Sequence, residues 1–281
     1  MKPRTMLLTG FLATVGLLIA VQLIAPVAQA APVVQVPDAV FLADLTWTEV
    51  RDKIAAGTTT IIFPTGGTEQ NGPHMILGKH HVIIEHASEQ IARRLGNALV
   101  APVLDYVPEG NVDPPSGHMR YAGTITLPNE YFMKVTEYAA RSFKAHGFTD
   151  IVLLGDSGGN QRGLAAVAEL LNEEWAGSGV RVHHVPEYYI AAFQPPGEFF
   201  QWLEAQGETP EDIGSHAGIL CTAQLLAIDP STVRADKIAG SDPANGVRGD
   251  PRRATAAYGE KGVEFKIEAA VTRIREMVAA R

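Results

Sequence analysis

Short runs of apolar residues alternate with longer amphipathic stretches from about residue 40 to residue 230. The short runs are rich in β-branched residues, which is typical of buried strands, while the longer stretches repeat apolar residues at helical spacing. The predicted strands are 59–63, 98–103, 151–154 and 180–185, and the predicted helices are 80–96, 129–147, 160–175 and 217–228. This alternation predicts an α/β fold with a mostly parallel central sheet and helices on both faces.

The N-terminal segment has the pattern of an export signal. Lys2 and Arg4 precede an uncharged run, and the small-x-small sequence that ends at Ala30 is typical of a signal peptidase site. We expect cleavage after Ala30, which leaves one domain, residues 31–281, in the periplasm or outside the cell. An uncleaved membrane anchor is the alternative interpretation, because the apolar run is about long enough to span a bilayer.

Composition narrows the classes of partner. The chain has 281 residues, of which 46% are hydrophobic and 19% charged, so it can bury a core of ordinary size. Its formal net charge of −8 makes nucleic acid and anionic membrane surfaces unfavourable partners. Cys221 is the only cysteine, which excludes an intramolecular disulfide and a multi-thiolate metal site. We therefore expect a small-molecule substrate and no stable membrane contact after cleavage.

The first polar segment follows the predicted strand that ends at Phe63. It contains Glu69, His74 and His80, and imidazole with carboxylate is a ligand set that suits Zn²⁺ or Mn²⁺. His80 lies on the apolar stripe of the predicted helix and should face inward, where an imidazole needs polar partners. We interpret these three residues as metal ligands. Histidines that only bond backbone carbonyls of the loop are the alternative.

The second polar segment joins a strand to a helix with the sequence Gly-Asp-Ser-Gly-Gly-Asn, residues 155–160. A glycine-rich turn in this position can present backbone N–H groups to a ligand, and it also matches the G-x-S-x-G pattern of a nucleophile elbow. Asp156 and Ser157 are therefore candidate catalytic residues, and Gly158, Gly159 and Asn160 are candidate substrate-binding residues. The alternative is a structural turn in which Asp156 or Ser157 caps the helix.

A third segment opens the helix that carries Cys221. His216 follows Ser215 in the predicted first turn, where the positive end of the helix dipole favours the neutral imidazole. A neutral imidazole can act as a base or a metal ligand at neutral pH. His216 as an incidental neighbour of a capping Ser215 is the alternative.

Together these segments resemble the creatininase family, the creatinine amidohydrolase-like proteins. The run 64–78 is similar to that family's first motif, and 106–126, with Ser116-x-His118, is similar to its next block. The turn 155–160, the His-Ala-Gly sequence at 216–218 and the tail 246–255 are similar to three further blocks in the same order. The resemblance implies an α/β/α fold, amide hydrolysis, a homo-oligomer, commonly a hexamer, and His216 as a proton shuttle.

The resemblance also implies a two-metal site, and this sequence departs from it. Asn71, His80 and Ser157 occupy positions where the family has His, Asp and His. A bridging carboxylate replaced by one imidazole cannot hold two cations, because one neutral imidazole nitrogen binds one metal ion. We therefore expect one divalent metal on Glu69 and His80, completed by Asp156, His74 or His118, with Asn71 and His118 also candidates for binding substrate.

Two other functions remain open from the sequence. In one, a metal-free hydrolase uses Ser157 as the nucleophile, with His216 or His80 as the base. In the other, the altered site only binds a small molecule. The interpretation that we carry to the structure is a metal-dependent hydrolase of a C–N amide bond, which can be cyclic, or of a lactone.

Overall fold

The core of the structure is a four-stranded sheet whose strands are all parallel. The computed structural model describes residues 38–193 and 197–280, so the predicted export signal lies outside the described residues. The strands are β1 (Thr60–Thr65), β2 (Ala98–Val100), β3 (Asp150–Gly155) and β4 (Arg181–His184), in the order β2-β1-β3-β4. Every residue of β1 and β3 is buried, which explains why these strands are apolar runs without alternation.

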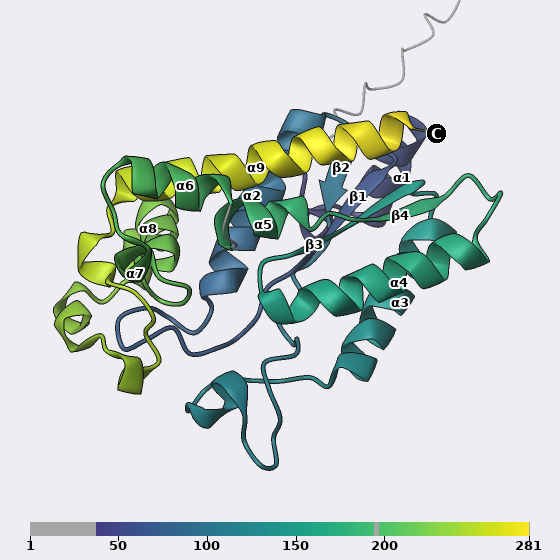
Figure 1. Cartoon of the computed structure of the whole chain (residues 1–281). Helices are drawn as coiled ribbons and strands as arrows, with labels where there is room; N and C mark the ends of the chain where they lie inside the picture. Colours follow the sequence, from purple (N-terminus) through teal and green to yellow (C-terminus); the bar gives the residue numbers. More distant parts are fainter. Residues whose placement is uncertain (1–37, 194–196, 281) are drawn as a thin grey trace, which may run out of the picture. The chain divides into compact units, whose positions relative to one another are not determined.

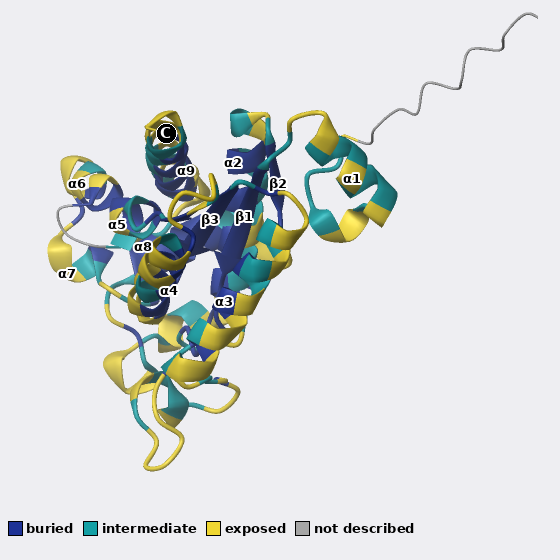
Figure 2. Ribbon diagram, turned by 90° about the vertical axis from the view of Figure 1, so that its right-hand side faces the viewer, coloured by how far each residue is buried: buried dark blue, intermediate teal, exposed yellow. Residues whose placement is uncertain are grey.

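Helices cover both faces of this sheet (Figures 1 and 2). Ile61 and Phe63 of β1 point to one face and pack with side chains of α3 and α4, while Ile62 points to the other face and packs with α2 and α9. The helices are α1 (Trp47–Ala55), α2 (Lys79–Leu95), α3 (Asn129–Ala145), α4 (Gln161–Glu174), α5 (Glu187–Phe193), α6 (Glu198–Ala205), α7 (Pro210–Ile213), α8 (Ile219–Ile228) and α9 (Ala256–Ala279). The predicted fold class, a parallel sheet between two helical layers, is confirmed.

The predicted elements are present with small shifts at their ends. Strand 98–103 is shorter than predicted and ends at Val100, shortly before Pro102, which has no backbone N–H to donate to a neighbouring strand. Helix 217–228 begins at Ile219, because Ala217 has a positive φ of 54° and Gly218 is extended. No helix in the described part of the chain is both long and apolar enough to span a bilayer.

The C-terminal helix α9 was not among the predicted elements, although it covers one face of the sheet together with α2 (Figure 1). One side of it, which includes Val263, Ile267 and Ile274, packs against α2 and the sheet. Gly259 lets it approach α8 closely, since a Cβ at that position would lie 1.8 Å from the carbonyl oxygen of Ala223. This packing carries Lys266 to the edge of the sheet where the polar segments meet.

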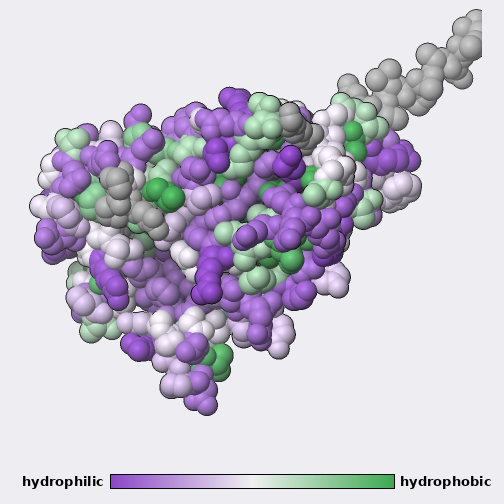
Figure 3. Space-filling view, turned by 45° about the vertical axis from the view of Figure 1, so that its right-hand side comes forward, coloured by the Kyte–Doolittle hydropathy of each residue, from purple (hydrophilic) through white to green (hydrophobic). Residues whose placement is uncertain are grey.

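The surface agrees with the sequence composition. On the face shown in Figure 3, hydrophilic residues predominate and hydrophobic ones are scattered. The surface of this face therefore does not mark a functional site, and the candidate site residues are identified by the cavity that they line.

Candidate active site

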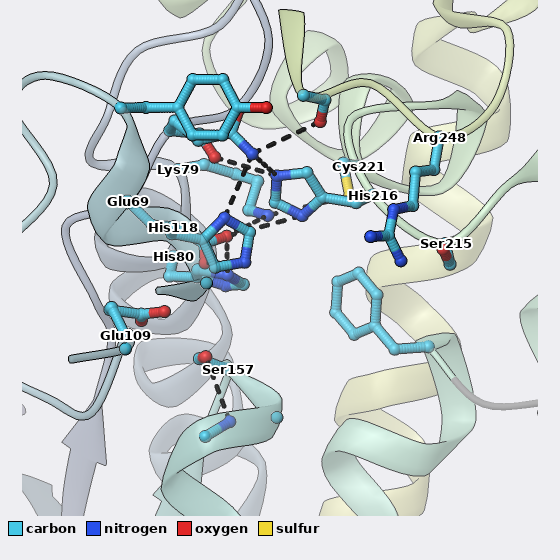
Figure 4. Close-up of a pocket in the computed structure, with 18 of the residues that line it drawn as sticks. Glu69, Lys79, His80, Glu109, His118, Ser157, Ser215, His216, Cys221 and Arg248 are labelled. Carbon is cyan, nitrogen blue, oxygen red and sulfur yellow. Dashed lines mark hydrogen bonds and ion pairs between the residues drawn. The ribbon is translucent and has the colours of Figure 1, made fainter. Parts of the chain in front are cut away.

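A cavity of about 580 Å³ lies where the loops after β1 and β3 meet the loop 106–126 and the start of α8. The carboxyl ends of parallel strands all reach the same edge of the sheet, so loops that are distant in sequence converge there. Figure 4 shows the side chains that line this cavity. They include Glu69, Gln70, Lys79, His80, Glu109, His118, Ser157, His216 and Arg248.

Glu69 is the central group of the cavity wall, and it is 2% exposed. Its Oε1 atom lies 3.2 Å from the Lys79 ammonium and 2.9 Å from His80 Nε2, and its Oε2 atom lies 3.1 Å from His118 Nε2. Burial alone would raise the pKa of Glu69, but attraction to Lys79 and His80 lowers it well below its usual value. Glu69 is therefore an ionised carboxylate at neutral pH.

Asp156 is a second buried carboxylate, and the His80 ring connects it to Glu69. His80 Nδ1 lies 2.6 Å from Asp156 Oδ2, so the His80 ring bridges Asp156 and Glu69. The other oxygen of Asp156 accepts hydrogen bonds from the Lys266 ammonium and, at 2.9 Å, from the hydroxyl of Tyr188. Burial alone would raise the pKa of Asp156, but Lys266 and His80 hold it far below its usual value.

Lys79 is a buried cation in the wall of the cavity. Its ammonium donates to Glu69 Oε1 and lies 3.7 Å from the sulfur of Cys221. Burial alone would lower the pKa of Lys79, but Cys221 and the carboxylates of Glu69 and Asp156 raise it. The two buried lysines, Lys79 and Lys266, thus balance the two buried carboxylates, and His80 is held between them.

Gln70 sets the orientation of the two histidines that face the cavity. The Gln70 side-chain oxygen accepts from the backbone N–H of Gly72, so its amide nitrogen points to His118 Nδ1, at 3.1 Å. His216 Nε2 lies 2.9 Å from the carbonyl oxygen of Gln70 and 3.0 Å from the Gln70 side-chain amide nitrogen, so the tautomer of the ring decides whether it donates to the first or accepts from the second. In the tautomer that donates to the carbonyl oxygen, His216 Nδ1 keeps its lone pair, and this atom lies 3.7 Å from Glu69 Oε1.

The His216 ring is neutral in this environment. Burial, together with the charge of Lys79, lowers the pKa of His216 to about 3, and burial also lowers the pKa of His118. A neutral imidazole beside a carboxylate offers a nitrogen lone pair to a cation. In the tautomer with its proton on Nε2, the Nδ1 atom of His216 is therefore available to a ligand in the cavity.

The donor set fits one divalent cation. Glu69, His118 and His216 each offer one atom, and these atoms lie within 4.8 Å of one another. Two imidazoles and one carboxylate are ligands that Zn²⁺ and Mn²⁺ accept. Because His118 Nδ1 accepts from the Gln70 amide, the proton of the neutral ring is on Nε2, and it would have to leave for Nε2 to bind the ion. No other group of three such side chains converges in the described part of the chain, so a second cation has no comparable set of ligands.

Glu109 also lines the cavity, and sequence reasoning did not single it out. It is 5% exposed, and its Oε1 atom has no hydrogen-bond partner among the described residues. Burial and the nearby charge of Glu69 raise the pKa of Glu109 to about 9. Glu109 is thus protonated at neutral pH and can donate a hydrogen bond into the cavity.

The structure brings several predicted site residues together. Three of them, His80, His118 and His216, lie around the carboxylate of Glu69 (Figure 4). The turn residues Ser157, Gly158 and Gly159 also line the cavity. Both ring nitrogens of His80 face carboxylates, which leaves neither for a cation. The Ser157 hydroxyl accepts from the backbone N–H of Gly159, at 3.4 Å, and its other contact is with the side chain of Glu109, whose pKa it lowers.

Four predicted site residues do not line the cavity. Asp156 lies beneath it, and Asn160 donates to the backbone oxygens of Thr65 and Gly66. Asn71 donates to the backbone oxygen of Glu69, at 2.9 Å. His74, predicted as a metal ligand, has its ring nitrogens 3.0 Å from the hydroxyl of Thr222 and 3.1 Å from that of Ser241. Their polar atoms hold the loops in place instead of facing the cavity.

One residue that sequence reasoning missed carried a signal. Lys79 begins α2, where the helix dipole disfavours a positive charge, so its presence there indicated a nearby acid. Gln70 and Glu109 carried no such signal, because their roles depend on the meeting of distant loops.

Comparisons with known proteins identify a family for this chain. The sequence profile of the creatininase family, described as creatinine amidohydrolase, matches residues 43–274. Creatinine amidohydrolase of Pseudomonas putida is 27% identical over 206 residues, which is 73% of this chain and 78% of that protein. The mycofactocin precursor peptide peptidase of Mycolicibacterium smegmatis is 25% identical over 240 residues, 76% of this chain and 84% of that protein.

A solved structure of a manganese form of creatininase shares the fold. It superposes with a TM-score of 0.71 at 24% identity and covers 85% of this chain and 98% of its own. The family profile spans most of the sequence and all of the cavity residues named above. Members of this family are metal-dependent amidohydrolases, and this chain belongs to the creatininase family as one of its hydrolases.

Proposed function

We propose that this chain hydrolyses a C–N amide bond, linear or cyclic, or the ester bond of a lactone, and that it works with one divalent cation, Zn²⁺ or Mn²⁺. The observation that carries the proposal is the convergence of Glu69, His118 and His216 on one cavity. When bound there, the cation would polarise a carbonyl group or activate water. The mycofactocin peptidase and creatinine amidohydrolase relatives support an amide bond as the target.

The residues around the donor set have separable tasks. Lys79 and His80 hold the Glu69 carboxylate in place and ionised, and Gln70 fixes the orientation of His118 and His216. Glu109 is protonated at neutral pH and lines the same cavity, so it is placed to donate a proton or a hydrogen bond to a reacting group. These tasks describe a hydrolytic site whose charges are organised before substrate binds.

The metal-free serine mechanism has less support. A serine nucleophile needs a base within hydrogen-bond reach, and no imidazole nitrogen bonds the Ser157 hydroxyl among the described residues. The three imidazoles of the cavity instead surround the Glu69 carboxylate.

Metal analysis tests the proposed function. Purified protein should contain about one Zn²⁺ or Mn²⁺ per chain, and His118→Gln and His216→Gln should each weaken metal affinity by at least about 100-fold. The matched control is His81→Gln, because His81 pairs with Asp105 outside the cavity. A protein that takes up neither metal, or a His118→Gln variant with wild-type metal affinity, would contradict the proposed ligand set.

Export and self-association are further parts of the proposal. The small-x-small pattern that ends at Ala30 supports cleavage and a periplasmic or secreted location, and the family resemblance supports a homo-oligomer. Intact-mass measurement of the protein from its native cells should show a chain that begins at Ala31. Light scattering on the same material should show a mass several times that of one chain.

A further inference from the structure

Arg248 places an unpaired positive charge at the cavity. It is exposed, it lines the cavity, and its guanidinium points toward the space beside His216 (Figure 4). Within residues 38–193 and 197–280, no carboxylate pairs with it and no hydrogen bond holds its side chain. Its neighbours differ, because Arg252 pairs with Asp250 and Arg253 pairs with Glu208.

The backbone fixes Arg248 beside His216. The N–H of Arg248 donates to the carbonyl oxygen of His216, at 2.7 Å, and the N–H groups of Ser215 and His216 both donate to the carbonyl oxygen of Arg248. Gly214 makes this approach possible, since a Cβ there would lie 1.9 Å from the Arg248 carbonyl oxygen. The base of the Arg248 side chain therefore has a set position relative to the imidazole.

The charges around the cavity favour an anion. The lining of the cavity has three cationic side chains, Lys79, Arg120 and Arg248, against two carboxyl groups, those of Glu69 and Glu109. Arg248 and Arg120 add positive charge, and no described carboxylate pairs with either one. The cavity is thus locally positive in a chain whose formal net charge is −8. A local field of this kind concentrates small anions.

We propose that Arg248 binds a free carboxylate of the substrate, so that the substrate is a small amide that also carries a carboxylate. The planar guanidinium matches a carboxylate through two parallel N–H···O bonds. With the carboxylate held by Arg248, the amide of the same molecule reaches the groups around Glu69 and His216. This inference rests on the proposed hydrolase function and names its substrate class.

Matched probes test the proposal. The panel pairs N-acyl amino acids with the corresponding N-acyl amino acid amides, with spacers of increasing length, and includes an N-acyl aminomethylphosphonate. Binding is measured by calorimetry on the metal-loaded protein, and amide hydrolysis is measured by amine release. Wild-type protein should bind the best acid roughly tenfold more tightly than its amide partner.

Two variants and a control separate the role of Arg248 from general charge. Arg248→Gln should abolish the preference for the acid, and Arg248→Lys should retain part of it, because lysine keeps the charge but not the planar fork. Arg252→Gln should behave as wild type. The proposal is overturned if no acid binds in the millimolar range, if acid and amide bind equally, if Arg248→Gln keeps the preference, or if the phosphonate binds more tightly than the carboxylates.

The two proposals fail in distinguishable ways. Binding that prefers acids and depends on Arg248, but without hydrolysis of any probe, would support carboxylate binding and count against the hydrolase function. Hydrolysis without a preference for acids would support the hydrolase and overturn the assignment of Arg248.

Discussion

The loop after β1 and the turn after β3 begin next to each other, because the last residues of the two strands, Thr65 and Gly155, are paired in the sheet. The loop after β1 presents Glu69 and Gln70 to the cavity, where both contact the histidines. The turn after β3 buries Asp156 completely and ties itself to the neighbouring loop through Asn160. The loop after β1 thus provides candidate reactive groups, whereas the turn after β3 mainly holds the site in place.

The difference follows from how each carboxylate is satisfied. Asp156 has Lys266, Tyr188 and His80 as partners, and it does not line the cavity. Glu69 has partners as well, but two of them, His118 and His216, are neutral rings at the cavity. A buried carboxylate surrounded by fixed donors stabilises the fold, whereas one that shares the cavity with neutral imidazoles can bind a cation.

The largest expected effect is a loss of stability when the buried ion pair between Lys266 and Asp156 is broken. Lys266→Met keeps the approximate shape of the side chain but leaves Asp156 without its cation, and breaking a buried ion pair in this way costs about 3–5 kcal/mol. Urea unfolding should show this loss. The control is Arg94→Met, which breaks the more exposed pairs with Glu264 and Glu268 and should cost about 0–1 kcal/mol.

A double variant keeps this test decisive if Lys266→Met does not fold. Adding Asp156→Asn removes the unpaired charge, so the Lys266→Met/Asp156→Asn protein should recover part of the lost stability. A Lys266→Met protein as stable as wild type but inactive would reverse the comparison, because Asp156 would then belong to the chemistry.

The second prediction divides the loop after β1 into two parts. His74 lies in this loop but packs between Thr222 and Ser241, and burial lowers its pKa to about 4. Since the unfolded chain takes up a proton near pH 6.5 and the folded chain does not, stability present above pH 6.5 is lost as the pH falls toward 4. The loss is up to about 3 kcal/mol.

Measuring the free energy of unfolding against pH checks this prediction. His74→Gln should be less stable at neutral pH but should lose less stability between pH 6.5 and 4 than wild type. The metal content of His74→Gln should equal that of wild type, because His74 does not line the cavity. A lowered metal content would return His74 to the ligand set that the sequence predicts.

The sequence alone predicts the fold well, and the reasons are local. The predicted strands 59–63 and 151–154 are mainly apolar runs, because β1 and β3 are buried on both faces. His80 was correctly placed on the inward face of its helix, where it is 4% exposed. The exception is α9, whose buried positions Val263, Ile267, Ala270 and Ile274 recur at helical spacing and could have been found.

The candidate site could be predicted only in part, because its partners come from different loops. Spacing indicated that Glu69 and His80 would meet, but it could not show that Asp156 would take the other nitrogen of the His80 ring. Lys266 reaches Asp156 from a helix more than a hundred residues away, which no local pattern encodes. The free guanidinium of Arg248 likewise depends on the backbone pairing with His216.

The smallest expected effect is that of Ser157→Ala, and a large effect there would contradict the division of roles between the loop after β1 and the turn after β3. Ser157→Ala removes a hydroxyl that contacts Gly159 and Glu109 but has no imidazole nitrogen as a hydrogen-bond partner among the described residues, so kcat/KM for amide hydrolysis should fall by less than about tenfold. If Ser157 were the nucleophile, the fall would be several orders of magnitude, and a fluorophosphonate probe would label wild type but not the variant. Labelling of that kind would move the chemistry from the loop after β1 to the turn after β3, since the groups around Glu69 would then serve only to hold the site together.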